Sequence, residues 1–208
     1  MKLETRWLGR IAFEEALALQ DALVSERAAP DASSLPDLLL LLEHEPVYTI
    51  GRTPDQSSLR DTAQLPHPVV QINRGGQATY HGPGQLVGYP ILRLAERGQD
   101  LHRYLRDLEG VLIEALAEYG LRAGRREGLT GVWVEDRKIA SIGVGVRRWI
   151  SMHGFALNVC GDLTPFTQIT PCGIAGVQMT NLERETGRLA DVRSVADHVA
   201  AVFQRRFC

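Results

Sequence analysis

A glycine-rich segment between two apolar stretches constrains the fold of this chain most strongly. Residues 74–85, RGGQATYHGPGQ, contain four glycines, and glycine at that density allows positive φ angles and close approach of the backbone. The flanking residues 69–73 and 86–94 are apolar stretches that predict strands. The segment therefore joins two strands. It does not match the two common phosphate-binding fingerprints, GxGxxG before a helix and a loop ending in GK[ST].

Hydrophobic periodicity predicts the other elements. Apolar residues at helical spacing predict helices over 11–27, over 101–119 with Asp100 as N-cap, and from Asp191 onwards. Strands are expected at 38–42 and in an antiparallel meander of 131–135, 138–148 and 151–159, whose first turn is Asp136 and Arg137. Segments rich in Pro, Asp and Ser predict loops at 30–37 and 53–68.

Length and composition favour one globular unit. The chain has 208 residues, of which 44% are hydrophobic and 23% charged, so a single domain over residues 1–208 can bury its own core. Central strands with helices placed irregularly around them indicate an α/β protein of the α+β type. We expect a mixed, largely antiparallel sheet with flanking helices.

Charge and hydropathy exclude several classes of partner. The formal net charge is −2, and the arginine pairs are scattered along the chain, so nucleic acid is not an expected partner. No apolar run approaches the roughly 18 to 20 residues of a membrane span, and the first ten residues lack the apolar stretch of a signal peptide. We expect a cytoplasmic protein that does not bind membranes.

Three cysteines are present, and their settings differ. Cys160 ends the apolar run FALNVC and resembles a small core residue, while Cys208 is the last residue of the chain. Cys172 lies in TPCGI, a stretch without periodicity that predicts an ordered, accessible loop. No CxxC spacing is present, which argues against a zinc site or a disulfide, and we expect no metal. Cys172 is therefore the candidate nucleophile.

A nucleophilic cysteine needs a proton acceptor or a nearby cation. The candidates are His44, His81, His153 and Lys138. For His44 and His153 we favour an ordinary role as strand-end histidines that hydrogen-bond to backbone. Lys138 follows a tight turn at the start of a strand, so its amine could project from the sheet, although a solvated turn lysine is the more common case.

Four motifs together resemble one enzyme family. In order along the chain they are RGGQATYHGPGQ (74–85), DRKIASIG (136–143), HGFALNV (153–159) and TPCGI (170–174). This series is similar to that of the lipoyl(octanoyl) transferases, and the resemblance covers nearly the whole chain. It implies a fold like the catalytic domain of biotin and lipoate protein ligases. It also implies transfer of an octanoyl group from acyl carrier protein to a lysine of a lipoyl domain, without ATP or another cofactor.

The resemblance also implies roles for individual residues and partners. Cys172 would carry the acyl group as a thioester, and Lys138 would favour the thiolate of that cysteine and transfer protons. The acyl and thioester pocket would be lined by Arg74, Gly75, Gly76, Gln77, Ala78, Thr79, Tyr80, His81, Ser141, Ile142, Gly143, Gly154, Phe155 and Ala156. The acceptors would be the glycine-cleavage H protein and the 2-oxoacid dehydrogenase acyltransferase subunits. We expect a monomer.

Three other functions remain open at this point. An ATP-dependent lipoate or biotin ligase of the same fold would not need Cys172. A non-catalytic acyl carrier would leave the pairing of Lys138 with Cys172 unexplained. A cysteine hydrolase would release the acyl group to water, and only kinetics would distinguish it from a transferase.

Overall fold

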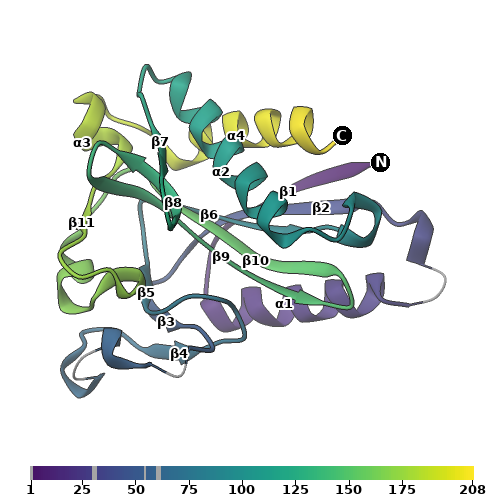
Figure 1. The fold of residues 1–208 in the computed structure, drawn as a ribbon, viewed down its shortest axis with the longest axis horizontal. Coiled ribbons are helices and arrows are strands. Elements are labelled where there is room, and N and C mark those ends of the chain that lie inside the picture. The colour runs from purple at the N-terminus through teal and green to yellow at the C-terminus, as the bar shows by residue number, and fades with distance from the viewer. Residues whose placement is uncertain (1, 30–31, 54, 60–61) are drawn as a thin grey trace.

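The computed structural model describes residues 2–29, 32–53, 55–59 and 62–208. Within these residues, an eight-stranded sheet has the order β1-β2-β6-β10-β9-β8-β7, with β11 beside β9, and a three-stranded sheet has the order β4-β3-β5 (Figure 1). The strands are β1 (Leu3–Ile11), β2 (Asp37–His44), β3 (Val47–Ile50), β4 (Val69–Gln71), β5 (Thr79–His81), β6 (Gln85–Ile91), β7 (Gly124–Arg126), β8 (Leu129–Val134), β9 (Arg137–Arg147), β10 (Ile150–Asn158) and β11 (Gln178–Met179). The helices are α1 (Phe13–Arg27), α2 (Leu101–Ala117), α3 (Leu182–Thr186) and α4 (Val192–Phe207).

The large sheet is mixed and largely antiparallel, as predicted. β1 pairs in parallel with β2, and β11 pairs in parallel with β9. The other pairs in this sheet are antiparallel. The predicted meander is confirmed as β8, β9 and β10.

Helices cover both faces of the large sheet, and this explains the run of five leucines in β2. Leu38, Leu40 and Leu42 pack in the cluster that contains residues of α1. Leu39 and Leu41 point the other way, into the cluster formed with α2 and α4. Figure 1 shows α1 below the sheet and α2 and α4 above it. A strand buried on both faces has no polar side, which is why its sequence does not alternate.

Two predicted helices require corrections to their ends. The first begins at Phe13, because Ile11 still pairs with His44 in the β1–β2 ladder and Ala12 has an extended backbone. The helix predicted over 101–119 ends at Ala117, although its predicted cap is confirmed, with the Asp100 side chain accepting a hydrogen bond from the backbone of Arg103. The C-terminal helix begins at Val192 with Asp191 as its N-cap.

Several strands were not predicted, for different reasons. β1 lies at the edge of the sheet and is mostly exposed or half-buried, so its sequence carries no clear apolar alternation. β7 and β11 are three and two residues long. β5 lies inside the glycine-rich segment itself, where it pairs with β3.

The predicted turns and loops also differ in detail from the structure. The first turn of the meander is formed by Glu135 and Asp136, one residue earlier than predicted, because Arg137 already pairs with Val134. The two predicted loops contain short 3-10 turns at 32–34, 57–59 and 62–64. Residues 30, 31, 54, 60 and 61 of these predicted loops lie outside the described residues.

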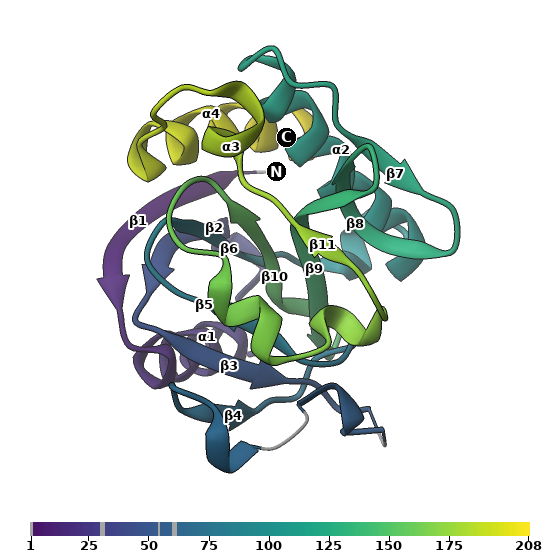
Figure 2. The ribbon, with the colours of Figure 1, turned by 90° about the vertical axis from the view of Figure 1, so that its left-hand side faces the viewer.

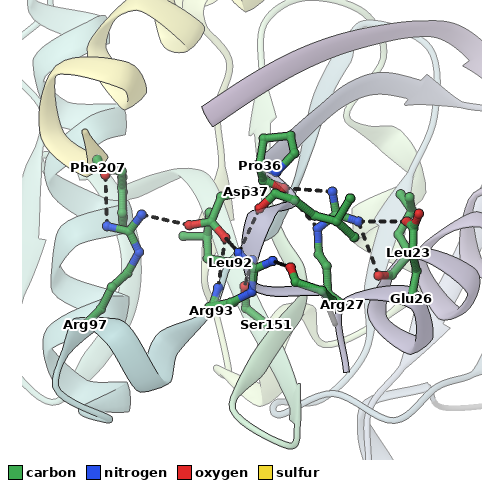
Figure 3. Close-up of polar contacts among 12 residues, drawn as sticks. Leu23, Glu26, Arg27, Pro36, Asp37, Leu92, Arg93, Arg97, Ser151 and Phe207 are labelled. Atoms are coloured by element: carbon green, nitrogen blue, oxygen red, sulfur yellow. Dashed lines mark hydrogen bonds and ion pairs between the residues drawn. The ribbon is translucent and has the colours of Figure 1, made fainter. Parts of the chain in front are cut away.

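A buried ionic network fixes the end of the sheet away from the glycine-rich segment (Figure 3). Asp37, at the start of β2, is almost fully buried and pairs with Arg97 at 2.8 Å. Its other oxygen accepts a hydrogen bond from the backbone N–H of Arg93 at 3.1 Å. Arg97 also donates to the carbonyl of Phe207 at 2.9 Å, near the end of α4. The network ties β2 to α4, and removing either partner of such a buried pair is strongly destabilising.

Candidate active site

One cavity, with a volume of about 190 Å³, lies between the large sheet and the glycine-rich segment. Its sheet side is formed by the middle of β9 and β10, and its other side by residues of the segment 72–81 and by Cys172. Figure 2 shows the segment that carries Cys172 passing in front of β5 and returning as β11 beside β9. Residues of all four family-like motifs thus line one cavity.

Cys172 occupies an irregular turn that holds its side chain toward the sheet. Its backbone φ is 55°, a left-handed conformation that is uncommon for a non-glycine residue. The backbone N–H of Cys172 donates to the carbonyl of Ala78 at 2.8 Å. Its Sγ lies 3.2 Å from Nζ of Lys138 and 3.6 Å from Oγ of Ser141. The prediction of an accessible loop cysteine is confirmed, since Cys172 is partly exposed.

Lys138 is buried, and its amine is directed at the cysteine. Its side chain is only 1% exposed, so the structure rules out the more common solvated turn lysine. The chain of Lys138 runs across Gly131, where an added Cβ would lie 2.6 Å from Cε. Within the described residues no carboxylate forms an ion pair with this amine. The thiol of Cys172 is therefore the acidic group within hydrogen-bonding distance of it. A buried polar group such as this amine requires a hydrogen-bond partner.

Arg74 supplies a buried cation at the cavity wall. It donates to the carbonyl of Gly75 at 2.9 Å, and to the carbonyl and hydroxyl of Thr49 at 3.1 and 3.0 Å. Burial lowers the pKa of the Arg74 guanidinium, and the negative charge of the Cys172 thiolate opposes that shift. Its methylene stem packs against Gly143, where an added Cβ would lie 3.0 Å from Cδ. The side chain is thus fixed by neutral acceptors and adds positive potential to the cavity.

Three buried histidines are neutral near pH 7. Burial lowers the pKa of His81 to about 3 and the pKa values of His44 and His153 to about 4. The predicted backbone bond of His44 is confirmed, because its Nδ1 lies 3.1 Å from the carbonyl of Ile11. For His153 the prediction is wrong: it lies in the middle of β10, and its Nε2 has no partner among the described residues.

Most of the predicted pocket residues line the cavity. Those that do are Arg74, Gly76, Gln77, Thr79, His81, Ser141, Ile142, Gly143, Gly154, Phe155 and Ala156. Gly75, Ala78 and Tyr80 do not. Tyr80 lies between two lining residues of β5, and strand geometry turns it to the opposite face, where it packs against Tyr48 and Phe166. Ala78 acts through its backbone, which bonds to Cys172.

Several lining residues were not predicted. They are Phe13, Ile72, Tyr89, Gly128, Leu129, Thr130, His153 and Ile174. Tyr89 bonds through its hydroxyl to Nε2 of His44 at 2.7 Å, and burial raises its pKa, so it remains a neutral phenol. These residues come from separate parts of the chain. Apart from His153, which begins one of the four motifs, their side chains carry no signal that distinguishes a cavity wall from core.

The other two cysteines are remote from this chemistry. Cys160 is half-buried, and burial raises the pKa of its thiol, which disfavours the thiolate. Cys208 is exposed at the end of α4. Neither lines the cavity around Lys138.

Among the described residues, no group of three or more His, Cys, Asp or Glu side chains could hold a metal ion. The cavity side chains within hydrogen-bonding distance of the Cys172 sulfur are Lys138 and Ser141. The chemistry that this arrangement can perform is therefore that of a thiol beside an amine.

None of the helices that the structure describes combines enough length with enough apolar character to cross a bilayer.

Comparison with known proteins identifies the family. Residues 12–204 match the lipoyl protein ligase A/B catalytic domain. An octanoyltransferase of Geobacter sulfurreducens is 56% identical over 196 residues, which cover 94% of this chain and 81% of that protein. An octanoyltransferase of Synechococcus elongatus is 49% identical over an alignment that covers 100% of this chain and 89% of that protein.

Solved structures with low sequence identity share the fold. A bipartite lipoate protein ligase from Thermoplasma acidophilum superimposes with a TM-score of 0.76 at 16% identity, covering 100% of this chain and 84% of that one. A biotin protein ligase from Aquifex aeolicus, in complex with biotin and ATP, gives a TM-score of 0.62 at 16% identity, covering 98% and 69%. The fold is thus that of the lipoate and biotin ligase catalytic domains, and the chain belongs to the octanoyltransferase family of acyltransferases.

Proposed function

We propose that this protein transfers an octanoyl group from acyl carrier protein to a specific lysine of lipoyl domains, through a thioester on Cys172. The observation that carries the proposal is the 3.2 Å between Nζ of Lys138 and Sγ of Cys172 inside a largely apolar cavity. A thioester is an activated acyl donor, so transfer to an amine needs no nucleotide, and a thiolate is a good leaving group. Residues 1–208 act as one catalytic domain in this proposal.

In the first half-reaction, Lys138 takes the proton of Cys172. The resulting thiolate attacks the donor carbonyl, and a bond forms between Sγ and the acyl carbon. Collapse of the tetrahedral intermediate breaks the bond to the carrier's sulfur, which leaves with the proton held by Lys138. Lys138 is neutral again when the acyl-enzyme has formed.

In the second half-reaction, the ammonium group of the acceptor lysine gives one proton to neutral Lys138. Its free amine attacks the Cys172 thioester, an amide bond forms, and the carbon–sulfur bond breaks. The second proton lost by the attacking nitrogen ends on the departing cysteine. Lys138 then releases its proton to solvent, which restores the starting state.

The oxyanion that forms in both steps needs hydrogen-bond donors. The backbone N–H groups of Cys172 and Gly173 already donate to the carbonyls of Ala78 and Thr170, at 2.8 and 2.9 Å. Those of Gly76 and Gln77 donate no hydrogen bond within the described residues, and both residues line the cavity. In this proposal these two N–H groups donate hydrogen bonds to the oxyanion, so the glycine-rich segment takes part in catalysis.

The acyl chain provides affinity through burial. Ile142, Phe155 and Ala156 give the sheet side of the cavity an apolar surface. An octanoyl chain has about seven carbons beyond its carbonyl, and burial at about 0.8 kcal/mol per methylene sets an upper bound of about 6 kcal/mol. The acceptors in this proposal are the lipoyl domains of the glycine-cleavage H protein and of the 2-oxoacid dehydrogenase complexes.

An ATP-dependent ligase is the second candidate, because solved ligases share the fold. A ligase would activate a free acid and would not place a thiol beside the amine of Lys138. The test is the intact mass of the protein after incubation with octanoyl-acyl carrier protein in the absence of ATP. We expect an octanoyl adduct that maps to Cys172 and disappears when lipoyl domain is added. An absence of adduct, with activity only when octanoate and ATP are supplied, would favour the ligase.

A further inference from the structure

Two residues that line the catalytic cavity also line a second hollow. This hollow has a volume of about 240 Å³, and its lining includes Gln71, Asn73, Val146 and Met152. Ile72 and His153 line both spaces, and they are the residues that the two linings have in common. We name this pair of side chains the end wall.

His153 is held in the end wall by an unusual backbone conformation. Its φ is 57° in the middle of β10, a left-handed backbone conformation that strains a non-glycine residue. The side-chain carbonyl of Gln20, a fully buried residue of α1, accepts a hydrogen bond from the His153 N–H at 2.7 Å. The imidazole ring is buried and makes no hydrogen bond through Nε2 among the described residues. Strain of this kind persists where the surrounding structure enforces a functional geometry.

The end wall lies about one octanoyl length from the nucleophile. Ser141, which contacts Sγ of Cys172, pairs with Ala156, and His153 pairs with Val144 three residues further along β9. Three residues of strand span about 10 Å. An extended eight-carbon acyl chain, with C–C bonds of about 1.5 Å, spans about 9 Å from carbonyl to methyl.

We propose that Ile72 and His153 set the length of the acyl chain by closing the cavity beyond the eighth carbon. Longer chains would have to displace the end wall into the second hollow, while shorter chains would leave apolar space unfilled. The proposal rests on the proposed acyl transfer and adds the residues that determine its chain-length specificity. One methylene in a closed apolar pocket changes the rate by about 10- to 200-fold.

The test compares acyl chains in competition on the same protein. Equimolar hexanoyl, octanoyl, decanoyl and dodecanoyl thioesters of acyl carrier protein are mixed with the enzyme, and intact mass gives the proportion of each adduct on Cys172. The first variant is His153→Gly, which removes the ring and also relieves the positive φ. The second is Ile72→Ala. The control is Gln71→Ala, an exposed residue that lines the second hollow but not the catalytic cavity.

We expect the unaltered protein and Gln71→Ala to form mainly the octanoyl adduct. In His153→Gly and Ile72→Ala, the ratio of dodecanoyl to octanoyl adduct should rise by about tenfold or more. If the ratio were unchanged in both variants while the octanoyl adduct still formed, the end wall would not determine chain length. The proposed function would remain intact. No adduct of any length on the unaltered protein would overturn the proposed function and the end wall with it.

Discussion

The two sides of the catalytic cavity are built in different ways. The sheet side consists of β9 and β10, whose antiparallel ladder runs from Ile150 opposite Arg147 to Leu157 opposite Ala140. The other side consists of the short strand β5 and of loops with 3-10 turns and positive φ angles. The amine of Lys138 belongs to the regular side and the thiol of Cys172 to the irregular side. The reactive pair thus forms only where the two sides meet, and changes on each side should have separable effects.

Loss of the thiol should have the largest effect. We expect Cys172→Ala to lower the rate of octanoyl transfer by at least about a thousandfold, because no covalent intermediate can form. Cys160→Ala is the matched control, since Cys160 lies outside the cavity, and it should retain most of the activity. The measurement is transfer of octanoyl to a purified lipoyl domain. Comparable losses in the two variants, with a lowered melting temperature in both, would point to a folding effect.

Loss of the amine should separate the two half-reactions. In Lys138→Ala we expect deacylation by the lipoyl domain to slow by about a hundredfold, because the incoming amine loses its proton acceptor. Acylation should slow less. A cation that lowers the pKa of a thiol raises the fraction of thiolate but lowers the nucleophilicity of each thiolate, so the two effects partly cancel. Octanoyl-Cys172 should therefore accumulate, which intact mass would detect.

The control for this variant is Lys2→Ala, which removes the other lysine of the chain, an exposed one. It should leave both steps unchanged. If Lys138→Ala blocked acylation but allowed normal aminolysis of a preformed acyl-enzyme, the amine would act chiefly by stabilising the thiolate.

The difference between the regular sheet side and the irregular side of the cavity also explains how much of this site the sequence predicts. Apolar periodicity identified the meander that carries Lys138, because a half-buried ladder leaves a regular pattern. The burial of Lys138 was not predictable from periodicity, since it depends on the gap left by Gly131 on the neighbouring strand. The turn at Cys172 has no period, and only its resemblance to a known motif indicated its partner. Ile72 and His153 were not assigned to the cavity, because their role depends on which two spaces they separate.

Histidines on both sides of the cavity should make stability depend on pH. His81 comes from β5, His153 from β10, and His44 lies between Phe13 and Tyr89. Their folded pKa values of about 3 to 4 lie below the ordinary value of 6.5, so the unfolded chain binds more protons below pH 6.5. Stability is therefore present above pH 6.5 and is lost as pH falls toward 4.

Between pH 7 and pH 6, the three histidines together should lower the free energy of unfolding by about 2 kcal/mol. Urea unfolding at both pH values would measure this change. His44→Gln should reduce the dependence by about a third. His102→Gln, which alters an exposed histidine, serves as the control. A protein that became more stable as pH fell from 7 to 6 would contradict the assignment of neutral buried histidines.

The smallest effect concerns the contact that fixes the irregular side. Ser58 is buried in the 3-10 turn at 57–59, and its hydroxyl accepts a hydrogen bond from the N–H of Ala78 at 3.1 Å. Its carbonyl accepts one from the N–H of Thr170 at 2.7 Å. The carbonyl of Ala78 in turn accepts a hydrogen bond from the N–H of Cys172. Ser58 therefore supports the turn at Cys172 through two residues, Ala78 and Thr170.

Ser58→Ala leaves the buried N–H of Ala78 without an acceptor, which costs about 1–3 kcal/mol. Part of that cost should appear as a looser Cys172 turn, so we expect the rate of acylation to fall about fivefold while the acyl-chain preference stays the same. Ser57→Ala alters the exposed neighbour in the same turn and should not change the rate. Equal losses in the two serine variants would mean that the 3-10 turn as a whole matters. An unchanged rate in Ser58→Ala would mean that the turn at Cys172 is held by its own hydrogen bonds, such as the one from Gly173 to the carbonyl of Thr170 at 2.9 Å.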